Sequence, residues 1–246
     1  MSTPVVVEIC VDSVESARAA QAGGAVRVEL CSGLRAGGIT PSAGLIASVR
    51  RQISIALHVL IRPRTGDFVY SADELEVMKR DILLARQLGA DGAVLGVLDA
   101  AGSVDVAHTS ELVERARPME VTFHRAFDAT PDLLQGLDAV KQTGAARILT
   151  AGGEAAGKER ITRIARLVER VGNGVTIMAG GGLRESNVGA ILRATNVREV
   201  HTSLQPSAPA LPRKRFPSVS TGRGDLITQV LNPADVERFV QATLSS

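Results

Sequence analysis

Residues 121–128 read Val121-Thr122-Phe123-His124-Arg125-Ala126-Phe127-Asp128, a stretch that begins as a β-strand and ends in charged side chains. Its first three residues favour a pleated, buried segment, whereas His124, Arg125 and Asp128 come where the strand should end. Functional groups in α/β proteins commonly lie at such strand ends. Because side chains alternate between the faces of a strand, we expect only one of His124 and Arg125 to point inward. An ion pair or hydrogen bond that closes the strand end would explain these residues without a function.

Seven further β-forming segments alternate with helical segments along the chain. They lie at residues 5–10, 27–31, 56–61, 92–97, 147–150, 175–179 and 199–202. The helices between them begin at capping residues, as in the capping box of residues 71–74, and Gly-Ala joins from helix to strand recur at Gly24, Gly89 and Gly144. Eight strands alternating with eight helices in a chain of 246 residues predict an α/β protein, a single-domain (β/α)8 or TIM barrel.

An open, doubly wound sheet is the alternative fold. It predicts a glycine-rich phosphate turn after the first strand, and residues 11–13 contain no glycine. We therefore expect one domain over residues 1–246, with a long loop at about residues 203–231. This loop is rich in Pro, Ser and basic residues, and it is expected to form a lid or an ordered loop before a terminal helix that starts at Asn232-Pro233.

Composition argues against two classes of partner. The 28 Lys and Arg nearly balance the 26 Asp and Glu, so no overall field attracts nucleic acid or an anionic membrane, and aromatic residues that could stack on bases make up only 2%. No apolar run is long enough for a transmembrane helix. The start, residues 1–4, lacks the features of a signal peptide, so we expect a cytoplasmic protein with reduced cysteines. The sequence leaves a homo-oligomer open.

The first two strands carry the same pattern, Glu8-Ile9-Cys10 and Glu29-Leu30-Cys31. In each strand Glu and Cys share a face, so all four side chains would gather at the carboxyl end of the barrel if the strands lie at similar heights, although barrel shear can offset them. A pair of thiols can bind a soft metal, but two are too few for an all-thiolate zinc or iron–sulfur site. Alternatively, both Cys are small apolar core residues. Buried Glu would need cationic or hydrogen-bonding partners.

Two loops at the same end are candidates for anion binding. Residues 62–67 hold Arg62 and Arg64 beside Asp67, which could clamp a carboxylate or phosphate or form internal salt bridges. Gly180-Gly181-Gly182 precedes a helix after the seventh strand, where barrels often bind phosphate on backbone N–H groups. A tight turn would explain the glycines equally well. His201, at the end of the eighth strand, would face the same opening if its side chain points inward.

Several of these motifs together resemble the CutC family of copper homeostasis proteins. The resemblance rests on residues 8–10, 28–31, 37–42, 61–64, 66–68, 122–128 and 180–182. It implies a cytoplasmic TIM barrel linked to copper handling, and it proposes Cys10 and Cys31 as Cu(I) ligands. The Pro-rich stretch at residues 206–212 departs from the family pattern.

Two functional hypotheses remain, with a copper ion or a small anionic molecule as ligand. The first is a Cu(I)-binding protein that uses Cys10 and Cys31. The second is an enzyme that acts on a small anionic or phosphorylated substrate. Its acid and base candidates are Glu8, Glu29, His124 and Asp128. Its anion-binding candidates are Arg62, Arg125, Gly180, Gly181, Gly182 and His201.

Overall fold

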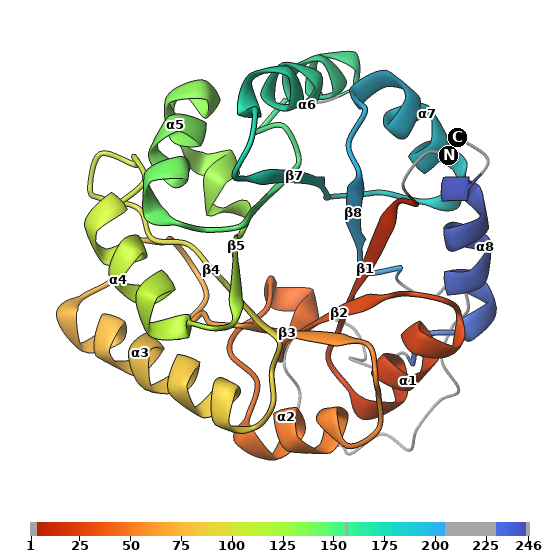
Figure 1. Ribbon diagram of the computed structural model, residues 1–246, viewed down its shortest axis with the longest axis horizontal. Helices are drawn as coiled ribbons and strands as arrows, with labels where there is room; N and C mark the ends of the chain where they lie inside the picture. The colour runs from red at the N-terminus through yellow and green to blue at the C-terminus, as the bar shows by residue number, and fades with distance from the viewer. Residues whose placement is uncertain (1–3, 156, 205–229, 245–246) are drawn as a thin grey trace, which may run out of the picture.

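The computed structural model of the protein describes residues 4–155, 157–204 and 230–244. Within these residues, eight parallel strands pair in chain order and close into a barrel. Figure 1 shows the helices as a ring around the strands. The predicted TIM barrel is therefore confirmed, and the alternative of an open sheet is wrong.

Strands and helices alternate along the chain, apart from two short 3-10 turns. The strands are β1 (Val6–Val11), β2 (Arg27–Leu30), β3 (Ala56–Leu60), β4 (Gly92–Leu95), β5 (Glu120–Phe123), β6 (Arg147–Thr150), β7 (Thr176–Ala179) and β8 (Glu199–Thr202). The helices are α1 (Val14–Ala22), α2 (Ala43–Arg50), α3 (Ala72–Gln87), α4 (Val106–Ala116), α5 (Leu133–Thr143), α6 (Gly157–Val171), α7 (Glu185–Thr195) and α8 (Pro233–Leu244). The 3-10 turns are η1 (Leu34–Ala36) and η2 (Arg125–Ala129).

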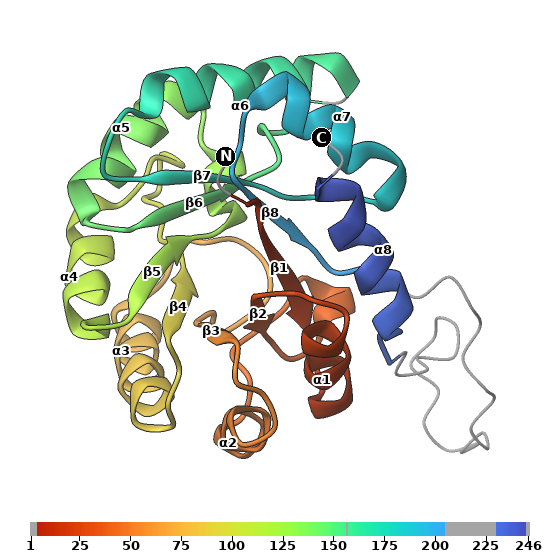
Figure 2. The ribbon, with the colours of Figure 1, turned by 45° about the vertical axis from the view of Figure 1, so that its right-hand side comes forward.

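The ends of the helices follow the capping signals of the sequence. Ser71 and Glu74 form the expected capping box of α3, and Asn232 accepts a hydrogen bond from the backbone N–H of Ala234 at the start of α8. Figures 1 and 2 show α8 between α1 and α7, where it completes the ring of helices. The loop expected at residues 203–231 lies almost wholly outside the described residues. In the described part of the chain, no helix is long and apolar enough to cross a membrane.

Two cores stabilise the barrel. Between strands and helices, side chains such as Ile9, Val28 and Leu57 are fully buried, and each contributes about 1.5–3 kcal/mol relative to an exposed position. Inside the barrel, a smaller cluster consists of Cys10, Cys31, Leu60 and Val94. Because β1 is buried on both faces, its alternating side chains point into different cores, and the polar ones point into the lumen.

The register of β1 and β2 sets the heights of the inward side chains. Glu8 pairs with Arg27, and Cys10 pairs with Glu29. Glu29 therefore lies beside Cys10 and not beside Glu8, an offset of two residues between the matching motifs of β1 and β2. The two Glu-Cys pairs therefore do not lie at equal heights, because barrel shear shifts one strand against the next. Glu8 instead pairs with His201 on its other side, across β8.

A network of buried charges fills the lumen nearer the amino ends of the strands. Arg27 forms ion pairs with Glu8, at 2.5 Å, and with Glu199. Arg147 forms ion pairs with the same Glu199, at 2.6 Å, and with Glu120, at 3.1 Å. Each buried guanidinium group thus pairs with two carboxylates, and this attraction offsets the free-energy cost of removing the guanidinium group from water.

Gly92 leaves the space that the ring of His58 occupies in the lumen. The two residues pair across β3 and β4, and a Cβ atom at Gly92 would lie 2.5 Å from His58 Nε2. Burial lowers the pKa of His58 to about 4, so its ring is neutral near pH 7 and packs as part of the core. A larger residue at position 92 would force this ring into its neighbours.

We expect the substitution Gly92→Ala to lower the free energy of unfolding by about 1–3 kcal/mol, because the added methyl group overpacks the lumen. The matched control is Gly44→Ala in the exposed first turn of α2, where the new Cβ meets only Ser42 Oγ at 4.0 Å. This control should stabilise the protein by up to about 1 kcal/mol through helix propensity. Urea unfolding followed by circular dichroism measures both changes, and equal effects of the two substitutions would contradict the argument.

Candidate functional site

A cavity of about 300 Å³ opens at the carboxyl end of the barrel. The predicted site residues that line it are Cys10, Glu29, Arg62, His124, Arg125, Gly181, Gly182 and His201. Glu8 and Cys31 are fully buried beside it, Gly180 begins the turn at its edge, and Asp128 lies elsewhere. The structure thus brings together most of the candidates that the sequence placed on separate strands.

Both thiols lie at one wall of this cavity. Cys10 Sγ approaches Cys31 Sγ to 3.8 Å and donates to Glu29 Oε1 at 3.4 Å. Gly38, at a φ of 78°, allows its loop to cover Cys31, because a Cβ there would lie 3.3 Å from Cys31 Cβ. The hydrogen bond with Cys31 and then burial raise the pKa of Cys10 well above its usual value. Without a bound metal, Cys10 is therefore a protonated thiol at neutral pH.

Glu8 and His201 form a buried, charged pair beneath the thiols. His201 Nδ1 lies 2.6 Å from Glu8 Oε1 and 4.0 Å from Glu29 Oε2. Burial alone would lower the pKa of His201, but the carboxylates of Glu29 and Glu8 outweigh it and raise the pKa. Burial would raise the pKa of Glu8, but the hydrogen bond from His201 and the charge of Arg27 hold it well below its usual value. Glu8 thus stays an anion and orients His201.

Glu29 differs from Glu8 in the direction of its pKa shift and in its contacts. Burial is the largest influence on Glu29, and it raises the pKa of the carboxyl group. Its Oε2 atom is buried and has no hydrogen-bond partner in the described part of the chain. One ligand atom each of Cys10, Glu29 and His201 lies within 4.8 Å of the others, so these three side chains could hold a metal ion. Sulfur, oxygen and nitrogen donors in one cluster fit a transition metal.

His124 lines the cavity and has a ring nitrogen without a hydrogen-bond partner among the described residues. Its Nδ1 atom accepts a hydrogen bond from the backbone N–H of Ala126 at 3.2 Å. Burial and then the charge of Arg62 lower the pKa of His124 to about 3, so the ring is neutral and its single proton lies on Nε2. Within the described residues, this Nε2 atom is buried and has no partner. His124 is therefore a donor without an acceptor.

Arg62 holds the loops around the cavity through backbone carbonyl groups. Its guanidinium group donates to the carbonyl oxygens of Gly37, Gly38 and Gly66 at 2.7–3.2 Å, and it lies 5.0 Å from the ring centre of Phe68. No carboxylate among the described residues pairs with it, so its charge stays uncompensated beside the cavity. The alternative of internal salt bridges holds for its neighbour in the loop, Arg64, which pairs with Asp67 at 3.0 Å.

The glycine turn after β7 is surrounded by guanidinium groups. Gly181 and Gly182 both have positive φ angles, 77° and 76°. The Cζ atom of Arg125 lies 3.6 Å from the position that a Cβ of Gly181 would take, and Arg160 donates to the carbonyl oxygen of Gly180. Arg184 lines the cavity directly after the turn.

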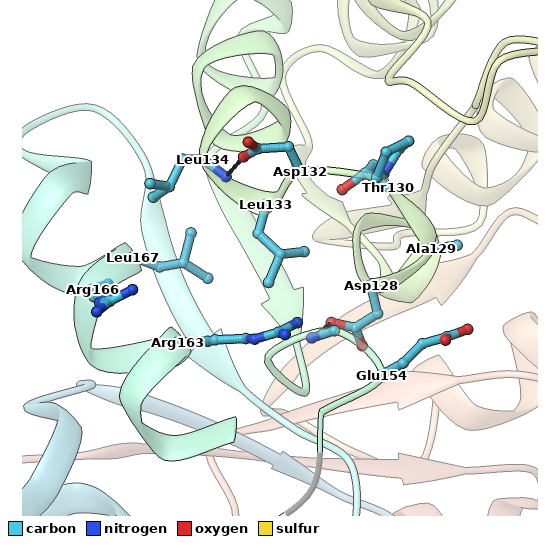
Figure 3. A pocket seen from close by; sticks show the side chains of 12 residues that line it. Asp128, Ala129, Thr130, Asp132, Leu133, Leu134, Glu154, Arg163, Arg166 and Leu167 are labelled. Atoms are coloured by element: carbon cyan, nitrogen blue, oxygen red, sulfur yellow. Dashed lines mark hydrogen bonds between the residues drawn. The ribbon is translucent and has the colours of Figure 1, made fainter. Parts of the chain in front are cut away.

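Asp128 anchors the loop after β6 and does not line the mouth cavity. It accepts hydrogen bonds from Thr150 Oγ1 at 2.6 Å, from the backbone N–H of Gly153 at 2.9 Å, and from Arg125 Nε at 2.8 Å. Figure 3 shows it at a second cavity of about 500 Å³, between the start of α5 and α6. These contacts make Asp128 the residue that positions Arg125 toward the mouth.

Both His124 and Arg125 line the cavity, which differs from the expectation that only one would point inward. The reason is that β5 ends at Phe123 and η2 begins at Arg125, so strand alternation does not extend to these residues. Sequence reasoning also missed Arg184 and Arg160. The position of Arg184 after a glycine run is a signal that could have identified it, whereas nothing in the spacing points to Arg160.

These features define a TIM-barrel protein with a candidate metal site and a ligand-sized cavity at its carboxyl end. The chain belongs to the CutC family, whose model matches residues 5–206. The family protein CutC of Xanthomonas campestris pv. campestris is 45% identical over 95% of this chain and 97% of its own. The human protein named copper homeostasis protein cutC homolog is 43% identical over 87% of this chain and 79% of its own.

A solved structure of CutC from Streptococcus agalactiae supports the same assignment. It matches the present structure with a TM-score of 0.76 at 34% sequence identity, and the match covers 81% of this chain and 98% of that one. The predicted resemblance to the CutC family is thus confirmed by family model, relatives and structure.

The pair of Glu8 and His201 leads to a prediction for stability against pH. Because the folded-state pKa of His201 is raised, its charge stabilises the fold fully below the unfolded pKa of about 6.5, and this contribution is lost as the pH rises through the folded pKa. We expect His201→Gln to lower the free energy of unfolding of the metal-free protein by about 1–3 kcal/mol near pH 5.5, and by less at about pH 9.

The control for this prediction is His108→Gln in α4, where an exposed imidazole pairs with Asp105 at 2.7 Å. Such a surface pair contributes about 0–1 kcal/mol. Urea unfolding of the wild type and both variants at both pH values, with a metal chelator present, measures the four changes in the free energy of unfolding. A loss in His201→Gln that stays constant with pH would contradict a charged His201.

Proposed function

We propose that this protein binds Cu(I) at the mouth of its barrel through the thiolates of Cys10 and Cys31, in the cytoplasm and as part of copper homeostasis. The observation that carries the proposal is the approach of the two sulfur atoms to 3.8 Å in a buried site. Two metal–sulfur bonds of about 2.3 Å each can meet at one ion between such atoms. Thiolates are also the ligands that Cu(I) prefers.

The family supports this reading of the cysteine pair. The human relative is named a copper homeostasis protein, and the reducing cytoplasm would keep both cysteines as thiols. The pKa of Cys10 is raised by its hydrogen bond with Cys31 and by burial, so a bound ion has to displace the proton. Copper affinity is therefore expected to increase with pH.

Cys10 also belongs to the cluster with Glu29 and His201, which offers one sulfur, one oxygen and one nitrogen ligand. Zinc accepts such a mixed set, whereas Cu(I) favours the two sulfur atoms. Cys31 is absent from this cluster, so the two ligand sets share Cys10 and differ in the other members. Substitutions at Cys31 and at Glu29 can therefore distinguish the copper proposal from a zinc site.

Under reducing, anaerobic conditions, we expect about one Cu(I) ion to bind per chain. Cys10→Ser and Cys31→Ser should each lower the Cu(I) affinity by orders of magnitude, because a single thiolate leaves the site incomplete. Titration against a competing Cu(I) chelator measures these affinities. Unchanged Cu(I) affinity in both variants would show that Cys10 and Cys31 do not bind copper.

Two controls make the copper experiment specific. His108→Gln removes an exposed imidazole of α4, away from the cavity lining, and should leave Cu(I) binding unchanged. Glu29→Gln should weaken zinc more than Cu(I), because a carboxylate is a harder ligand than a thiolate. Zinc binding that is tighter than Cu(I) binding and insensitive to Cys31→Ser would instead favour the mixed cluster.

A further inference from the structure

We propose that the mouth cavity is also the binding site of a small organic phosphate. Its phosphoryl group would lie against the turn of Gly181 and Gly182, and a further oxygen of the molecule would accept a hydrogen bond from His124. This inference goes beyond copper binding and does not depend on it, since none of these three residues belongs to the cysteine pair.

The turn supplies backbone donors for an anion. Gly181 and Gly182 have successive positive φ angles between the end of β7 and the start of α7, at Glu185. Both residues line the cavity. Backbone N–H groups at such a turn, in front of a helix, favour negative charge.

Side chains around the turn add positive charge. Arg125 and Arg184 line the cavity with the two glycines, and Arg125 Cζ lies 3.6 Å from the position that a Cβ of Gly181 would take. Arg160 contacts the carbonyl oxygen of Gly180, and the charge of Arg125 adds to burial in lowering its pKa. Asp128 is a carboxylate near these three arginines, and it pairs with Arg125. An anion at the turn would relieve the remaining repulsion between the cations.

His124 is the second and independent observation that indicates a ligand. Its side chain is only 6% exposed, it lines the same cavity, and its Nε2 donor has no partner among the described residues. A buried donor without an acceptor costs stability unless a ligand or ordered water satisfies it. Phe68 packs against the ring at a centroid distance of 4.9 Å and keeps its orientation.

Glu29 offers a further polar contact on the wall formed by β2. Its Oε2 atom is buried and has no hydrogen-bond partner among the described residues. Three residues that line the cavity, Glu29, Arg62 and His124, thus each have a buried atom without a hydrogen-bond partner among the described residues. A molecule that satisfies all of them carries hydroxyl or carbonyl oxygens in addition to the phosphate.

The volume of the cavity limits the size of this molecule. About 300 Å³ is at the lower end of the range for ligand pockets, which suits a phosphate on a short carbon skeleton. A phosphoryl group fits the turn better than a carboxylate does, because it has more oxygen atoms and a second negative charge for the surrounding guanidinium groups.

Isothermal titration of the metal-free protein, with a chelator present, tests the proposal with glycerol 3-phosphate, inorganic phosphate and acetate. We expect glycerol 3-phosphate to bind about two- to tenfold more tightly than inorganic phosphate, because it adds a hydrogen bond with His124. Inorganic phosphate should compete with it, and acetate should bind more weakly than either.

Arg184→Gln should weaken both phosphates by about 10- to 100-fold through the loss of a charge-assisted hydrogen bond. The matched control is Arg193→Gln, which removes an exposed cation from the last turn of the same helix, α7, and should change neither affinity. Equal losses of phosphate affinity in both variants would show that the phosphates respond only to the overall charge of the protein, and this result would overturn the proposal.

Two substitutions at position 124 separate ligand binding from structure. His124→Asn keeps an acceptor for the N–H of Ala126 but lacks the distal donor, so it should weaken glycerol 3-phosphate alone, by about two- to tenfold. His124→Gln retains a distal donor and should recover part of this loss. No phosphate binding by the wild type, or inorganic phosphate or acetate binding as tightly as the organic phosphate, would overturn the proposal. Cys31→Ser, at a residue that does not line the cavity, should bind phosphate normally, so failure of the phosphate proposal would leave the copper proposal untouched.

Discussion

The fully buried carboxylate of Glu8 is the constraint on which the rest of the site depends. An isolated anion in a barrel lumen would be strongly destabilising, so the fold has to supply cations at the same height. Arg27 and His201 come from the strands on either side of β1, and both contact Glu8 at 2.5–2.6 Å. Because these contacts hold β8, β1 and β2 in one register, they also fix the positions of Cys10 and Glu29 above them.

Polar groups in the lumen differ between the amino and carboxyl ends of the strands. Toward the amino ends, Arg27 and Arg147 each pair with two carboxylates, so the charges there are satisfied and contribute to a single well-ordered barrel. Toward the carboxyl ends, Glu29 Oε2 and His124 Nε2 have no hydrogen-bond partner among the described residues, although His201 Nδ1 lies 4.0 Å from Glu29 Oε2. Buried polar atoms without a hydrogen-bond partner are a cost to stability, and a ligand in the cavity would offset this cost at Glu29 and His124.

The two proposed ligands would occupy different walls of the same mouth. Cys10 and Glu29 lie on the wall of β1 and β2, whereas the glycine turn and Arg184 lie on the wall of β7 and α7. A soft cation at the sulfur atoms and a phosphate at the guanidinium groups match the charges of these walls. His201 lies between these two walls, because its strand, β8, pairs with β7 on one side and with β1 on the other. Its ring contacts Glu8 and Glu29.

The sequence by itself determined the barrel, the family and most candidate residues, because strand periodicity, helix caps and recurring Gly-Ala joins are local signals. Only the tertiary structure decided which candidates act together. The two-residue offset of β2 brings Cys10 beside Glu29, and the end of β5 at Phe123 lets both His124 and Arg125 reach the cavity. The structure also assigned Asp128 to a loop anchor and revealed Arg160 near the turn. Register and side-chain pairing depend on contacts between residues distant in the chain, which local patterns do not encode.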